Sequence, residues 1–133
     1  MKKQMIPGCI VFILAAVIAA GSVSFLGPCV HEDGTAGACW WASRSLLGLG
    51  LLMLVLSLLA VLLRRARAGL YLSIFLTGLL GMLTPGTLIS LCRMSSMRCR
   101  AVMQPAMMIL FAAAGLAALC GWIACMRQTK GKA

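Results

Sequence analysis

A chain of 133 residues that is 62% hydrophobic and 11% charged has too little interior to bury its apolar side chains, which argues against a soluble domain. The formal net charge of +10 could indicate a nucleic-acid-binding protein. The basic residues, however, flank long apolar stretches in short clusters, a placement typical of membrane proteins. We therefore expect a lipid bilayer, and no nucleic acid, as a partner.

Four apolar segments are long enough to cross a bilayer, which takes about 20 residues of helix. In chain order they are residues 6–26, 40–63, 69–91 and 101–126. None alternates polar with apolar residues as membrane strands do, and a spanning segment must satisfy its own backbone polar groups. We therefore predict an all-α fold, in which residues 1–133 form one transmembrane domain, a four-helix bundle built from two helical hairpins.

The distribution of basic residues predicts the orientation of this bundle. Eight of the twelve lysines and arginines lie before residue 6, at 64–67 or after residue 126, places that share one side of a four-span chain. The positive-inside rule then puts both termini in the cytoplasm and makes the chain a multi-pass protein of the inner (plasma) membrane. The basic start and Ala19-Ala20-Gly21 resemble a cleavable signal, but the apolar run continues to Leu26, so we expect the segment to be retained.

Aromatic and small residues predict how the helices sit and pack. Trp40 and Trp41 are expected at the outer headgroup level, and Tyr71 and Trp122 at the inner level, where aromatic rings are enriched. Small residues recur every four positions in the first and last segments, and such stripes let helix backbones approach closely in lipid. They are Ala16 and Ala20 in the first segment and Ala113, Ala117 and Gly121 in the last. We therefore expect these two helices to pack together.

The third segment carries a helix breaker near its end. Pro85 removes a backbone donor and disfavours helix at Thr84, and Gly86 follows directly. The stretch from Pro85 to Leu91 is then either a kinked last turn or a short re-entrant piece, which membrane proteins tolerate where protein or water covers it. A proline kink is the simpler prediction, and a binding cavity is the alternative.

Two short polar loops on the outer side each hold a pair of cysteines. Cys29 and Cys39 belong to the first loop, and Cys92 and Cys99 to the second. In an oxidising compartment such pairs form disulfides that stabilise small exposed loops. Four cysteines allow three pairings, within the loops or between them, and the sequence does not choose among them. Structural disulfides are the favoured prediction.

Two other functions remain open for these cysteines, and the first is thiol–disulfide exchange. Four spans with a cysteine pair in each outer loop resemble the layout of the quinone-linked disulfide-generating membrane enzymes. The neighbouring Arg93, Arg98 and Arg100 would favour the reactive thiolate. The chain lacks, however, the Cys-x-x-Cys pair on which those enzymes and the related vitamin K epoxide reductases rely.

The second alternative is a copper site. Thiolates and thioethers suit Cu(I), and the second outer loop combines both. The candidate ligands are Cys92, Met94, Met97 and Cys99, with Met103 on the same helix face as Cys99, and His31 from the first loop. The chain has ten methionines, and methionine commonly fills gaps in a core. We therefore predict no cofactor, with copper as the alternative.

Three motifs combine cysteines with fixed neighbours. They are Phe25-x-x-Pro28-Cys29, Cys39-Trp40-Trp41, and Cys92-x-Met94-x-x-Met97-x-Cys99 with Pro105 shortly after. In these motifs the chain resembles a family of small four-span bacterial integral membrane proteins of unknown function. The resemblance covers most of the chain and implies a neighbourhood with transport components. In that family a histidine often follows the second cysteine of the first loop; Trp40 stands there in this sequence, which weakens the copper alternative.

The sequence favours a function that is not enzymatic. The chain's one histidine and two acidic residues are adjacent, at His31, Glu32 and Asp33, which leaves no acid–base pair among the spans. The small size and the small-residue stripes indicate an accessory or interaction subunit of a membrane complex, such as a transporter. Its partner would be another membrane protein or a second copy of the chain. Redox chemistry or Cu(I) binding at the outer face is the alternative function.

Overall fold

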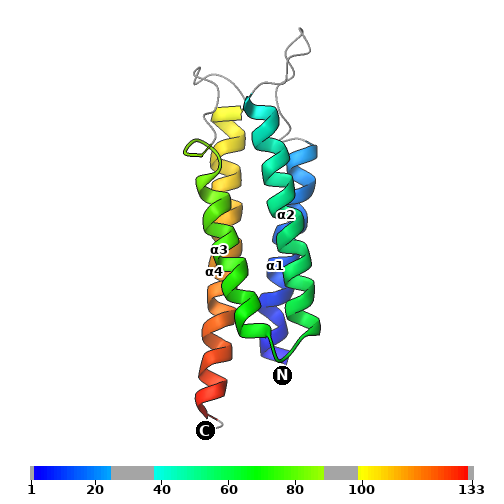
Figure 1. Ribbon diagram of the computed structural model, residues 1–133, viewed down its shortest axis with the longest axis vertical. Coiled ribbons are helices and arrows are strands. Elements are labelled where there is room, and N and C mark those ends of the chain that lie inside the picture. Colours follow the sequence, from blue (N-terminus) through cyan, green and yellow to red (C-terminus); the bar gives the residue numbers. More distant parts are fainter. Residues whose placement is uncertain (1, 25–37, 89–98, 132–133) are drawn as a thin grey trace.

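The computed structural model describes residues 2–24, 38–88 and 99–131. Its elements are α1 (Lys2–Val23), α2 (Ala38–Leu62), α3 (Arg67–Leu83), a π-helical turn η1 (Cys99–Met103) and α4 (Gln104–Gly131). The helices lie side by side along their length, and both chain termini lie at the same end of the bundle (Figure 1). The described ranges contain no β-strand. The predicted all-α bundle of two helical hairpins is therefore confirmed.

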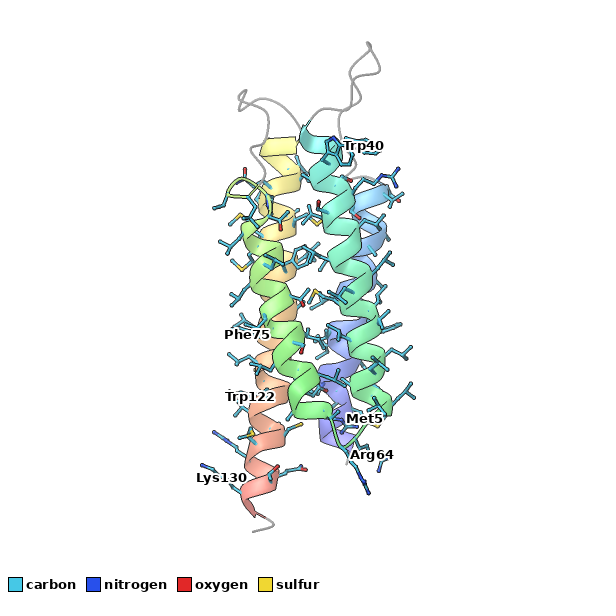
Figure 2. The ribbon with its side chains drawn as sticks, in the orientation of Figure 1. Met5, Trp40, Arg64, Phe75, Trp122 and Lys130 are labelled. Atoms are coloured by element: carbon cyan, nitrogen blue, oxygen red, sulfur yellow. The ribbon has the colours of Figure 1, made fainter. Side chains whose placement is uncertain are left out.

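The two ends of the bundle differ in what they contain. The terminal end holds both termini and the short turn between α2 and α3. The loop end is where α1 ends and α2 begins, and where α3 ends and η1 begins. In Figure 2, Trp40 lies at the loop end, whereas Arg64 and Lys130 lie at the terminal end. Neither name depends on the orientation of the bundle in the membrane.

Three of the helices are long and apolar enough to cross a membrane. Their apolar stretches are Met5–Val23 in α1, Trp40–Leu62 in α2 and Ala101–Gly131 in η1 and α4. Large apolar side chains point outward along the whole length of the bundle (Figure 2). Such a surface requires lipid as its solvent, because water would not tolerate apolar exposure on this scale.

The third helix is shorter than its predicted segment. α3 has 17 residues, which rise about 25 Å, slightly less than the roughly 30 Å hydrocarbon core of a bilayer. At its end, the Thr84 hydroxyl donates to the Leu80 carbonyl at 2.8 Å. Gly86 then turns the chain with a φ of 98°, a conformation that side-chain-bearing residues rarely adopt. Pro85 and Gly86 therefore end the helix at Leu83, at the break that the sequence predicts; residues 89–91 of the predicted segment lie outside the described part.

Buried residues recur in every helix at alternating steps of three and four. The series are Val11, Ala15, Ile18 and Ser22 in α1; Leu46, Gly50, Met53, Ser57 and Ala60 in α2; Arg67, Tyr71, Ile74, Gly78 and Gly81 in α3; and Met107, Phe111, Ala114, Ala118 and Gly121 in α4. Their mean spacing of about 3.5 residues is the heptad period of left-handed helix bundles. The contact faces therefore follow a heptad pattern.

Glycines allow the closest helix contacts. A Cβ atom on Gly78 would lie 3.2 Å from the Cα atom of Gly115 and from the Phe111 carbonyl oxygen, so the α3 and α4 backbones nearly touch. The Phe111 ring occupies the space that a side chain at Gly81 would need. In α2, a Cβ atom on Gly50 would lie 3.2 Å from the Ala19 backbone nitrogen. Close backbone approach maximises dispersion contacts, the main attraction between helices in lipid.

Helix α1 packs against both α2 and α4. Of the stripe residues, Gly121 is buried, Ala20 is exposed, and the other three are half-buried. The buried alanines of α1 are Ala15 and Ala19, one position earlier than the stripe. A four-residue repeat turns by about 40° at each step of an α-helix, so it drifts off a contact face that follows a 3.5-residue period.

The substitution Gly81→Ala tests the contact between α3 and α4. The new methyl group would collide with the buried Phe111 ring, and overpacking of this kind costs about 1–3 kcal/mol. Thermal unfolding in detergent should show a lowered midpoint. The matched control is Gly48→Ala, because nothing lies within 4 Å of a Cβ atom at Gly48. Equal midpoints for the two variants would contradict the assigned contact.

Candidate functional site

Most residues of the predicted disulfides and of the predicted copper site lie outside the described part of the chain. This holds for Cys29, His31, Cys92, Met94 and Met97, and for the side chains of Cys39 and Cys99. The backbone of Cys39 belongs to the first turn of α2 and that of Cys99 begins η1, so both lie at the loop end. The predicted disulfides and copper site therefore stay predictions. No cluster of three or more His, Cys, Asp or Glu residues suited to a metal occurs within residues 2–24, 38–88 and 99–131.

One candidate copper ligand is described, and its packing is known. Met103 is 2% exposed and belongs to the same core cluster as Leu46, Met107 and Phe111. The side chain therefore faces the interior of the bundle, where an apolar thioether packs well. η1, which ends at Met103, lies just before Pro105, and Pro105 cannot donate a hydrogen bond to the Ala101 carbonyl. The π-helical turn accompanies this missing bond.

At the loop end, α2 closes off the last turn of α1. The Ser43 hydroxyl donates to the Ser22 carbonyl at 2.8 Å, and the Ser22 hydroxyl donates to the Ala19 carbonyl at 2.9 Å. Carbonyls in the last turn of a helix have no partner within the helix, and an unsatisfied one is costly in lipid. Ser43 therefore fixes the register of α1 against α2 at this end.

Beside these serines lies a small pocket of about 100 Å³. It is lined by Ser22, Val23, Trp40, Ser43, Arg44 and Leu47. The guanidinium carbon of Arg44 lies 4.9 Å from the centroid of the Trp40 ring, a cation–π geometry. The rings of Trp40 and Trp41 meet edge to face, with centroids 4.9 Å apart. The sequence prediction placed the two tryptophans here but did not identify Arg44 as part of a site.

At the terminal end, Arg67 differs from the neighbouring arginines. It is 7% exposed, whereas Arg64 and Arg65 are exposed. Its Nε donates to the Ala60 carbonyl at 2.9 Å, and its Nη2 lies 3.4 Å from the Val61 carbonyl as a second donor. Both carbonyls belong to the last turn of α2, where the helix dipole also stabilises a positive charge. The basic cluster of the sequence therefore combines two roles, exposed charge and helix capping.

Tyr71, predicted near the inner headgroup level, lies in the core of the bundle, one turn after the start of α3. It is 1% exposed. A Cβ atom on Gly121 of α4 would lie 3.0 Å from its ring, and one on Gly8 of α1 would lie 3.1 Å from its hydroxyl oxygen. The tyrosine of α3 thus reaches both neighbours because two glycines make room for it. Arg67, Cys9 and Cys125 are near enough to interact with it electrostatically.

Three thiols of the spans are free in the described part of the chain. Cys9 and Cys120 are exposed on the bundle surface, and Cys125 is half-buried.

Trp122, predicted at the inner headgroup level, is half-buried against the core on the terminal half of α4 (Figure 2). The sequence signal that could have found the Tyr71 contact is the pair Gly8 and Gly121, each at a buried heptad position.

A bundle of four apolar helices with capped ends and a lipid-facing surface defines a small polytopic α-helical membrane protein. The chain belongs to the family described as "Domain of unknown function (DUF4418)", whose model matches residues 11–126. The match includes most of α1 and α4, all of α2 and α3, and both cysteine-bearing loops, so the resemblance to a membrane-protein family of unknown function is confirmed. No curated protein and no solved structure gives a significant match.

The substitution Arg67→Met tests the capping role of the buried arginine. It removes the donors to the α2 carbonyls, and hydrogen bonds to charged groups are each worth about 1.5–3 kcal/mol. The thermal midpoint in detergent should fall clearly. Arg65→Met is the matched control: it removes an exposed arginine two residues away and should leave the midpoint nearly unchanged. Similar losses in both variants would point to general charge effects instead of capping.

Proposed function

We propose that this protein is a non-enzymatic accessory or interaction subunit of a membrane complex, such as a transporter. Its partner would be another membrane protein or a second copy of the chain. The observation that carries the proposal is the outward face of α3, where small residues recur at Gly69, Ser73 and Thr77. A Cβ atom at Gly69 would have nothing within 4 Å, so this part of the helix is open to a neighbour.

The polar groups of this face are satisfied within the helix itself. The Ser73 hydroxyl donates to the Gly69 carbonyl at 3.0 Å, and the Thr77 hydroxyl donates to the Ser73 carbonyl at 2.8 Å. The face therefore offers a narrow, small-residue surface without unpaired donors. Small residues at four-residue spacing are typical of helix contacts in membranes, because they let a second backbone approach closely.

The length of α3 supports an association on the same face. Its 17 residues are shorter than the roughly 30 Å hydrocarbon core requires. A short hydrophobic helix is accommodated by local thinning of the bilayer or by oligomerisation. The exposed Leu72, Leu76 and Leu80 lie along one side of the small residues and would provide apolar contacts beside them.

Charge at the terminal end supports the proposed orientation. Arg64, Arg65, Arg127 and Lys130 are all exposed there. Clusters of exposed arginine and lysine mark the cytoplasmic side of membrane proteins. We therefore propose the inner membrane with cytoplasmic termini, which leaves the loop end, with its cysteines, on the outer side.

The substitutions Gly69→Leu and Ser73→Leu test the α3 face. Large side chains would hold a partner helix away, so gentle extraction and affinity purification should recover less of the co-purifying protein, or a smaller oligomer. The bundle should keep its thermal midpoint, because both positions are exposed. Gly48→Leu on α2 is the control, since that glycine also faces open space. A wild-type protein with no stable partner and no oligomer would count against this function.

We also propose that disulfides among Cys29, Cys39, Cys92 and Cys99 staple the outer loops. The loop-end position of the α2 start and of η1 supports it, because the chain segments next to Cys39 and Cys99 converge there. Non-reducing mass mapping of membrane-extracted protein, with metal analysis, should find these four cysteines oxidised and no copper. Cys9 and Cys120, free in the spans, serve as internal controls that should react with a maleimide once the protein is denatured without reductant.

Free loop thiols or stoichiometric copper would contradict the staples and favour the alternative function. In that case, the loop cysteines would perform thiol–disulfide exchange or bind Cu(I) with Met94, Met97 and His31. The double substitution of Cys92 and Cys99 by serine then separates the two possibilities. Loss of bound copper would identify Cu(I) binding, and loss of thiol oxidation would identify thiol–disulfide exchange. Intact partner assembly in the same variant would show that the loops act separately from assembly.

A further inference from the structure

We propose that the pocket between the loop ends of α1 and α2 binds the phosphate group of an anionic phospholipid, with Arg44 as the cation that holds it. The pocket is partly open and has a volume of about 100 Å³, room for several water-sized groups and therefore for a phosphate. This inference does not depend on the proposed accessory function, because it concerns α1 and α2 and makes no use of the α3 face.

The cation of this pocket is held in place by an aromatic ring. Arg44 stacks over Trp40 at 4.9 Å, which limits the freedom of its long side chain while leaving it exposed to a ligand. A guanidinium carries five N–H donors in a planar fork, and this geometry matches the oxygen atoms of a phosphate. A preordered arginine loses less conformational entropy when it binds, so the stacking favours affinity.

The floor of the pocket is built from interactions between the two helices. The Ser43 hydroxyl bonds the Ser22 carbonyl at 2.8 Å, and both serines line the pocket. Because this bond joins α2 to the end of α1, it fixes the distance between Arg44 and the end of α1. The pocket is thus part of a tied helix–helix junction.

The apolar lining selects a lipid over a free anion. Val23 and Leu47 line the pocket beside the polar residues, and Val23 is 65% exposed. Trp40 begins the apolar stretch of α2, so the pocket lies where hydrocarbon gives way to the polar interface. A phospholipid places its phosphate at that level and its acyl chains along the apolar helix surface. Inorganic phosphate would contact only the polar residues of the pocket and would gain nothing from Val23 and Leu47.

The net charge of the ligand follows from the net charge of the lining. Arg44 is the one ionisable side chain among the six lining residues. A zwitterionic headgroup would bring an ammonium group near this guanidinium, whereas phosphatidylglycerol brings a negative charge without a cation. Glu32 and Asp33 of the same chain are rival occupants by charge, and they lie outside the described residues.

Fluorescence of Trp40 provides a readout that is specific to this pocket. The substitutions Trp41→Phe and Trp122→Phe leave Trp40 as the single tryptophan of the three in the chain. Titration of this protein in detergent with short-chain phosphatidylglycerol should give a saturable change in Trp40 emission. Adding Arg44→Gln should weaken the apparent affinity about tenfold or more, the loss expected for a charge-assisted hydrogen bond. Arg44→Lys should fall between the two.

The control variant is Arg64→Gln, at the terminal end. It removes one positive charge from the chain but lies far from Trp40 (Figure 2), so the titration should not change. Thermal unfolding of every variant checks that the bundle is intact. An equal response to phosphatidylcholine or to inorganic phosphate alone would overturn the proposal, and so would an Arg44→Gln variant that binds as well as its parent. Binding that appears only after Glu32→Gln and Asp33→Asn would also overturn it, since the chain's own acids would then occupy Arg44.

Discussion

Close contact between helix backbones is the constraint on which the rest of this structure depends. In lipid, helices gain little from hiding apolar side chains from one another, so they must associate through dense packing and polar contacts. Helices α3 and α4 come together where Gly78 meets Gly115 and where the Phe111 ring lies over Gly81. Helices α2 and α1 come together in the same way at Gly50. Because these contacts recur on a 3.5-residue period, each helix presents one continuous face to the core and leaves the apolar side chains of its other faces to the lipid.

Polar side chains complete the bundle where the helices end. Ser43 of α2 satisfies a carbonyl in the last turn of α1, Arg67 of α3 satisfies carbonyls in the last turn of α2, and Thr84 bonds the last turn of its own helix. In two of the three cases the donor comes from the next helix in the chain. The same bond therefore caps one helix and positions its successor. Every helix end carries carbonyl groups that have no partner within the helix, and leaving them unpaired in lipid is costly. These contacts satisfy some of those carbonyls.

The surfaces with a proposed role lie away from these structural contacts. The small-residue face of α3 points outward beside a row of exposed leucines, and the Arg44 pocket opens at the loop end beside the two tryptophans. The backbones of Cys39 and Cys99 belong to the same end as the pocket. A partner helix along α3 and a lipid at the α1–α2 junction could thus be bound together, while the terminal end keeps its exposed basic residues for the opposite side of the membrane.

The sequence by itself determined the class of the protein, the number of its helices and their pairing into hairpins, because length and hydropathy decide what can cross a bilayer. It also predicted that Trp40 lies at the end of the bundle that holds the two polar loops, and that Pro85 breaks the third helix. It did not reveal that Tyr71 and Arg67 are buried, since composition alone makes a terminal tyrosine or arginine look interfacial. Nor did a four-residue stripe of alanines identify the buried face. Only the tertiary structure decided these points, because burial depends on what a neighbouring helix places opposite a side chain: Gly8 and Gly121 make room for Tyr71, and the Ala60 carbonyl accepts from Arg67.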